Sequence, residues 1–283
     1  MKTLAAVTPL EEQQLYEALK HVQEEGRLPK HIHKNVLIKS MLTHIGTPNS
    51  ELRDQLIYGS FCQLSLNNQI EHELYIELAE YGVSDAFLFH GIGECGTDTV
   101  FTRSFTTLLL ALILYKDNEE NFLPQGILDK IKENMILYIN AERDLRGFVP
   151  KKGWAHSIAH ASDVVDELAK SKKIDQESRL ALLHSLLDKI YVHQSVYVHD
   201  EDERISNAII SFLHNGVSPE EVAALVRGMP SKLHEIKKQV EEENYWFLYA
   251  NCKTFLKSLY FAINGRDELP TLQKEIESCL ASL

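Results

Sequence analysis

The sequence lacks several features that mark other protein classes. Its four cysteines in 283 residues form no CxxC pair and no tight cluster with histidine, which excludes a disulfide framework and a cysteine-based zinc site. We therefore expect reduced thiols in a cytoplasmic protein. Sustained alternation of apolar and polar residues is absent, as are Asn-Gly or Asp-Gly turns between β-branched runs. Strands are accordingly not predicted.

Long apolar runs and excess positive charge are also absent. The most apolar run, LLLALILY at 108–115, is far shorter than the ~20 residues that span a bilayer. The opening MKTLAAVTPL makes a poor signal peptide, because Pro9 and two glutamates interrupt it before a long apolar core develops. The 29 basic and 41 acidic residues give a net charge of −12, which repels nucleic-acid phosphates and anionic lipids. We expect neither membrane insertion nor nucleic-acid binding.

Helical spacing of apolar residues, in contrast, runs along almost the whole chain. The composition, 44% apolar and 25% charged, is that of an ordinary folded protein. A first helix is predicted at 10–26, with Leu15, Leu19 and Val22 on one side and Gly26 as its C-cap. The later helices are predicted in pairs: 34–45 with 51–66, 69–81 with 99–115, 125–141 with 154–169, 176–193 with 203–215, and 219–226 with 245–264.

The second helices of these pairs recur at intervals of about fifty residues, marked by Arg53, Arg103, His156, Arg204 and Lys253. A helical hairpin buries its apolar stripe only against its neighbours, so this interval is typical of an α-solenoid. We predict an all-α, HEAT-like α-solenoid of about five hairpins, forming a single domain over 1–283 with capping helices at 1–26 and 268–283. The alternative is an irregular helical bundle. In a solenoid the second helices line a concave groove, where a partner would bind.

The segment GFVPKKGWAHSIAHASD, 147–163, carries the main candidate site. On a helix starting at Trp154, the side chains of His156, His160 and Asp163 share one polar stripe opposite the apolar face. Three interpretations remain open: a solvated helix face, a polar binding face in the groove, or a metal site. Histidines four apart can share a metal with Asp163, but no HExxH motif and no further ligand is evident. On a solvated face, His156→Ala should hardly affect folding.

Arg103 is the only charged residue between Asp98 and Lys116, within an apolar helix. A buried guanidinium must be paired, so Arg103→Ala should destabilise the fold by about 3 kcal/mol or more. The alternative is capture of an anion by a free Arg103. The candidate acceptors are Asp54, Asp144 and Asp163.

GIGECG, 91–96, matches the G-x-G-x-x-G nucleotide-binding pattern. No strand-helix-strand context surrounds it, and Glu94 and Asp98 would repel a pyrophosphate at the following helix. We predict a flexible loop here.

Four segments resemble a known family: DLRGFVPKKGWAHSIAHASD (144–163), DEDERISNAIISFL (200–213), ELRDQLIYGSF (51–61) and RSF (103–105). The family is an uncharacterised bacterial domain-of-unknown-function family, numbered 2785 and found mainly in Gram-positive bacteria. The resemblance implies a HEAT-like helical-repeat fold and no particular activity. Together with Arg103, the residues that it singles out are the predicted groove residues: Trp154, His156, His160, Asp163, Asp144, Arg146, Asp202 and Arg204.

These patterns favour a binding scaffold over an enzyme. We expect an intracellular protein that binds a protein or peptide in its groove and needs no cofactor. The alternative is a metal-dependent hydrolase in which His156, His160 and Asp163 hold a divalent ion that lowers the pKa of a bound water. Nucleic-acid repair by a helical-repeat protein would require salt-dependent DNA binding, which the charge of −12 disfavours.

Overall fold

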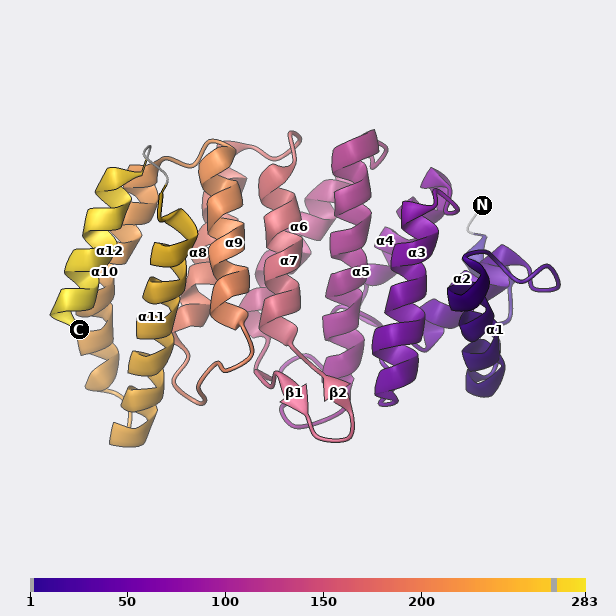
Figure 1. Cartoon of the computed structure of the whole chain (residues 1–283), viewed down its shortest axis with the longest axis horizontal. Helices are drawn as coiled ribbons and strands as arrows, with labels where there is room; N and C mark the ends of the chain where they lie inside the picture. The colour runs from indigo at the N-terminus through magenta and orange to yellow at the C-terminus, as the bar shows by residue number, and fades with distance from the viewer. Residues whose placement is uncertain (1–2, 266–268) are drawn as a thin grey trace. The chain divides into compact units, whose positions relative to one another are not determined.

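The computed structural model describes residues 3–265 and 269–283, and it consists of helices joined by loops (Figure 1). The only strands among these residues are two short ones, β1 (Phe148–Val149) and β2 (Gly153–Trp154). The predicted all-α class is therefore confirmed. The chain divides into two compact units, Met1–Val164 and Val165–Leu283, and the boundary lies within α7 (Ser157–Lys170).

The first unit begins with α1, which ends at the predicted cap. Gly26 has φ = 68°, a left-handed conformation that glycine adopts without strain. A π-helical segment, η2, runs directly into α3, so the helix predicted at 51–66 is present. In Figure 1, α3 and α5 lie side by side with α4 and α6 behind them. The elements before β1 are η1 (Leu4–Ala6), α1 (Glu12–Glu25), α2 (Lys34–Thr43), η2 (Glu51–Tyr58), α3 (Gly59–Leu66), α4 (His72–Gly82), α5 (Thr99–Glu120) and α6 (Gln125–Ala141).

Helix α5 is the core helix of this unit, and it is longer than predicted. Its side chains from Val100 to Leu114 are almost all buried. It is the one described helix long and apolar enough to cross a membrane, but 78% of that apolar window is buried inside the structure, as in a core helix. The chain approaches it closely at Gly46, where an added Cβ would lie 2.6 Å from the Thr102 Cα.

The β1–β2 hairpin replaces the first turn of the helix predicted at 154–169. Its antiparallel register pairs Phe148 with Trp154 and Val149 with Gly153. Gly153 has φ = 77°, and an added Cβ would lie 2.6 Å from the Ser50 Cβ. Only glycine therefore allows the hairpin to pack this closely on the start of η2.

The second unit contains α8 (Gln176–Asp188), η3 (Lys189–Tyr191), α9 (Glu201–His214), α10 (Pro219–Lys237), α11 (Glu242–Ile263) and α12 (Pro270–Ser282). Helix α9 packs against α11, and α10 packs against α11 and α12. The helix predicted at 219–226 continues through Pro230 to Lys237, because buried Met229 and Leu233 extend its apolar stripe. The predicted helix at 268–283 is α12, and residue 268 lies outside the described residues.

Candidate functional site

The region around the hairpin differs from the helix face that the sequence predicts. Trp154 lies on β2, so the predicted placement on α7 is wrong. His156 immediately precedes α7, and its carbonyl oxygen accepts a hydrogen bond of 3.0 Å from the His160 amide. The φ of His156 is 53°, a left-handed conformation that is strained for a residue with a side chain.

A chain of aromatic contacts runs from the hairpin into the core. The ring of Phe148 meets Trp154 edge-on at 5.2 Å, and Trp154 stacks on His156 at 4.8 Å. His156 meets His160 edge-on at 5.4 Å, and His160 meets Phe105 at 5.3 Å. Phe148 and Trp154 are 49% and 39% exposed, whereas His156 and His160 are 8% and 7% exposed. The exposed rings of Phe148 and Trp154 thus rest on the buried rings of His156 and His160.

The burial of His156 and His160 contradicts a solvated helix face, because the hairpin folds back over this side of α7. The His160 Nδ1 lies 3.2 Å from the carbonyl oxygen of Ser104 on α5. Asp163 is half-buried. In the described part of the chain, no three His, Cys, Asp or Glu side chains are grouped to hold a metal ion. The predicted ligands His156, His160 and Asp163 are therefore not assembled into a ligand set.

Arg103 is buried and paired, as predicted, with an exposed fraction of 0%. Its Nε and Nη2 donate to the two carboxylate oxygens of Glu142 at 2.7 and 2.9 Å. Its Nη1 donates to the carbonyl oxygens of His90 and Gly91 and to Thr99 Oγ1, at 2.8, 2.9 and 3.0 Å. Arg103 therefore offers no surface to a partner. The acceptor differs from the predicted candidates Asp54, Asp144 and Asp163.

Two effects oppose each other at this guanidinium. Burial acts to lower the pKa of Arg103, while the hydrogen bonds and charge of Glu142 outweigh it, so the pKa is raised above its ordinary value. The ion pair thus stabilises the charged form of Arg103 despite its burial.

The glycine-rich loop at 91–96 is held on two sides. Arg103 binds two of the backbone carbonyls at 90 and 91, and the Gly96 amide donates to Asp144 Oδ2 at 2.9 Å. Asp144 also accepts from Arg146, whose Nε and Nη2 lie 2.8 and 2.6 Å from its two oxygens. Arg146 Nη2 reaches on to the Thr97 carbonyl at 2.6 Å. Asp144 and Arg146 therefore tie this loop to the segment that leads into the hairpin.

Arg53 performs a similar task on the other side of the hairpin. Its Nη2 donates to the carbonyl oxygens of Lys152 and Trp154 at 2.6 and 3.3 Å, and it is completely buried. The guanidinium lies over the ring of Phe101, 4.1 Å from the centroid. It also forms an ion pair of 2.8 Å with Asp54 Oδ1. In the sequence, Arg53 stands out only through the interval of about fifty residues. Its role in binding backbone carbonyls could not be predicted, because such contacts require no particular residue type nearby in the sequence.

Burial dominates the electrostatics of the Arg53–Asp54 pair. It lowers the pKa of the Arg53 guanidinium and raises the pKa of the Asp54 carboxyl, and in each case it outweighs the mutual attraction. This pair differs from Arg103–Glu142, where pairing outweighs burial at the guanidinium.

The hairpin and its entry segment also collect positive charge. Residues 143–152 contain Arg143, Arg146, Lys151 and Lys152 against one acid, Asp144. Arg143 and Lys151 are exposed. Two of the four are paired: Arg146 with Asp144, and Lys152, whose Nζ lies 2.7 Å from both carboxylate oxygens of Asp98. The exposed Arg143 and Lys151 give this segment a local excess of positive charge in a chain of net charge −12.

Asp202 and Arg204, the remaining predicted groove residues, lie on α9 in the second unit. Asp202 is nearly buried and accepts a hydrogen bond from the Ser258 hydroxyl, which joins α9 to α11. Arg204 is exposed.

Comparison with known proteins gives one match. The family described as "Protein of unknown function (DUF2785)" matches residues 88–261, a span that includes the hairpin, Arg103 and Glu142 but not Arg53. No curated protein and no solved structure matches the chain.

Proposed function

The chain belongs to the DUF2785 family, and we propose that it is a binding protein whose β1–β2 hairpin captures an acidic, apolar-anchored segment of a protein partner. The four cysteines are free thiols, consistent with the expected cytoplasmic location. The predicted class, a protein- or peptide-binding scaffold, is retained, and the hairpin is assigned as its contact surface.

The exposed pair Phe148–Trp154 carries this proposal. Single exposed apolar residues are common on protein surfaces, but two large aromatic rings in edge contact form a preformed anchor. Trp and Tyr dominate the residues that contribute most to protein interfaces. The hairpin backbone is held by Arg53, and the Trp154 ring is stacked on buried His156. Little conformational entropy would be lost on binding, which favours affinity.

The charge of the surroundings defines the partner chemistry. Arg143 and Lys151 are exposed beside the aromatic pair in sequence, and a negatively charged segment would be attracted to them while the rest of the acidic chain repels it. Such steering acts over about 10 Å at moderate ionic strength. We therefore infer a segment with acidic residues flanking at least one apolar or aromatic side chain.

We further propose that the helical pairs stack as a HEAT-like α-solenoid. The interval of about fifty residues between second helices supports this arrangement, as does the packing of α4 on α5, α8 on α9 and α10 on α11. Trp154 and Arg146 would supply surface contacts in the first unit, and Arg204 would do so in the second unit. The buried predicted residues Arg103, Asp144, His156 and His160 would position them.

Selection from a library of short random peptides tests the proposal directly. Peptides captured by the wild-type chain should be enriched in Asp and Glu around an apolar side chain. Their binding, measured by fluorescence anisotropy, should weaken at least about tenfold in Trp154→Ala, the loss expected for a central aromatic anchor. It should also weaken as salt is raised.

Trp246 provides the matched control, because it is 54% exposed but lies on α11 in the second unit. Trp246→Ala should bind the selected peptides like the wild type. Enrichment of basic peptides, or binding that depends on Trp246 and not on Trp154, would refute the assignment.

A further inference from the structure

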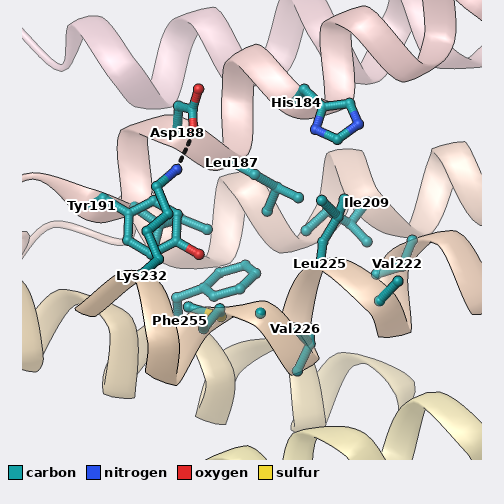
Figure 2. A pocket seen from close by; sticks show the side chains of 14 residues that line it. His184, Leu187, Asp188, Tyr191, Ile209, Val222, Leu225, Val226, Lys232 and Phe255 are labelled. Carbon is teal, nitrogen blue, oxygen red and sulfur yellow. Dashed lines mark hydrogen bonds and ion pairs between the residues drawn. The ribbon is translucent and has the colours of Figure 1, made fainter. Parts of the chain in front are cut away.

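A second candidate site lies wholly within the second unit, between α8–η3 and α10. It is a pocket of about 210 Å³ whose floor is formed by Ile209, Val226 and Phe255 (Figure 2). Because all its residues belong to the second unit, it is independent of the hairpin and of the function proposed for it.

Small residues on α10 leave this volume open. Gly228 lines the pocket, and an added Cβ there would meet no atom within 4 Å. A helix interior disfavours glycine by about 1 kcal/mol relative to alanine, so its presence here is not explained by the helix itself. The floor residues are buried and apolar, which suits an apolar ligand body.

Polar groups gather at one end of the pocket. Lys232 Nζ lies 2.6 Å from Asp188 Oδ1 and 3.9 Å from the centroid of the Tyr191 ring. Figure 2 shows the Tyr191 hydroxyl directed toward Phe255 and the pocket floor. Within the described residues this hydroxyl has no hydrogen-bond partner. Burial raises the pKa of Tyr191, so the hydroxyl remains a donor at neutral pH.

We propose that this pocket binds a small amphipathic carboxylate. Its aliphatic or aryl body lies on the Phe255 floor, and its carboxylate accepts hydrogen bonds from Lys232 Nζ and the Tyr191 hydroxyl. The volume equals that of about seven water molecules, which suits a body of about six to eight carbons.

The rim favours a carboxylate over an amine or an alcohol. Lys232 and Tyr191 both carry donors, and Asp188 accepts from Lys232 alone, at 2.6 Å. The Lys232–Asp188 pair is exposed, with side-chain exposed fractions of 43% and 61%, and such pairs contribute little stability. Asp188 can therefore turn into solvent when a ligand carboxylate replaces it. An amine would have to displace Lys232 from the Tyr191 ring and would meet its positive charge.

Calorimetric titration of the full chain with octanoate, octan-1-ol and octylamine tests the head group. Octanoate should bind at least about tenfold more tightly than the other two, the worth of one charge-assisted hydrogen bond. Lys232→Gln should remove the preference for octanoate over octan-1-ol. Tyr191→Phe should weaken octanoate binding and leave octan-1-ol binding closer to that of the wild type.

Gly228→Leu tests the location. A Cβ at this position would meet no atom within 4 Å, and the longer side chain would compete with a ligand for the pocket, so the variant should fold and lose octanoate binding. Gly126→Leu is the matched control, because Gly126 lies in α6 of the first unit and also has open space around it. It should bind octanoate like the wild type, and melting temperatures verify that both variants fold. Absent octanoate binding, tightest binding of octylamine, or unchanged binding in Gly228→Leu would each overturn the proposal.

Discussion

Truncation of Arg103 to alanine should destabilise the first unit severely. The guanidinium makes five hydrogen bonds, two of them to Glu142, and it is completely buried. In Arg103→Ala the buried Glu142, 1% exposed, loses both guanidinium donors, and the amides of Arg143 and Asp144 that remain at 2.9 Å do not neutralise its charge. Removing one partner of a buried ion pair costs about 3–5 kcal/mol. Since domains are stable by about 5–15 kcal/mol, this loss is a large part of the total.

Removing both charges should recover part of this loss. In Arg103→Met/Glu142→Gln no buried charge is left unpaired, so the double variant should be more stable than the sum of the single losses predicts. Recovery should be incomplete, because the carbonyl oxygens of His90 and Gly91 lose their donor in either case. We expect a coupling energy of about 1–3 kcal/mol.

Urea unfolding monitored by tryptophan fluorescence in a Trp246→Phe background provides the assay. In that background Trp154 alone reports, and it lies in the first unit. This matters because a chain with two compact units can unfold in more than one step. An Arg103→Ala variant within about 0.5 kcal/mol of the wild type would show that the ion pair does not support the fold. Strict additivity in the double variant would show that the two charges are not coupled.

Two further predictions concern the hairpin. The raised pKa of Asp54 means that its ionisation is disfavoured in the folded state, so its contribution to stability is present below its ordinary pKa and is lost as pH rises through the raised value. Asp54→Asn should therefore be at least as stable as the wild type, within about 1 kcal/mol, at neutral pH, and any gain should shrink on acidification in urea titrations at two pH values. His156→Ala should lower the free energy of unfolding by about 1–2 kcal/mol through lost stacking on Trp154, contrary to the near-neutral effect of a solvated residue. His156→Gly should be less destabilised because glycine relieves the positive φ, and equal melting temperatures for the two variants would argue against strain there.

Most helices could be predicted from the sequence because their signals are local. Helix α6 has the predicted bounds, and α1 ends at Gly26 as predicted. The helix predicted at 219–226 is too short, because α10 continues through Pro230 and buried Met229 and Leu233 hold it together. Burial of apolar side chains therefore outweighs the helix-breaking tendency of proline at this position.

The hairpin could not be predicted in the same way. Each strand has two residues, too few for a period-two pattern, and the strands are held by Arg53 and by the close approach at Gly153. PKKG at 150–153 is a turn signal that could have indicated a break before α7. The burial of Arg103 could be predicted from its apolar helix. Its partner could not, because Glu142 lies just beyond the end of α6, far along the sequence.

The two buried arginines explain how irregular backbone can present Trp154 in one orientation. Loops cannot satisfy their own carbonyl groups as helices do, and an apolar core around them would leave those groups unpaired. A guanidinium supplies five donors in a fixed plane, so it satisfies several carbonyls and also sets the angle between the segments that carry them. Arg53 does this for the carbonyls of Lys152 and Trp154, and Arg103 does it for the loop at 90 and 91. Apolar packing alone would not fix the angles between these segments. The buried guanidinium groups therefore set the orientation of the aromatic pair of the hairpin as well as its stability.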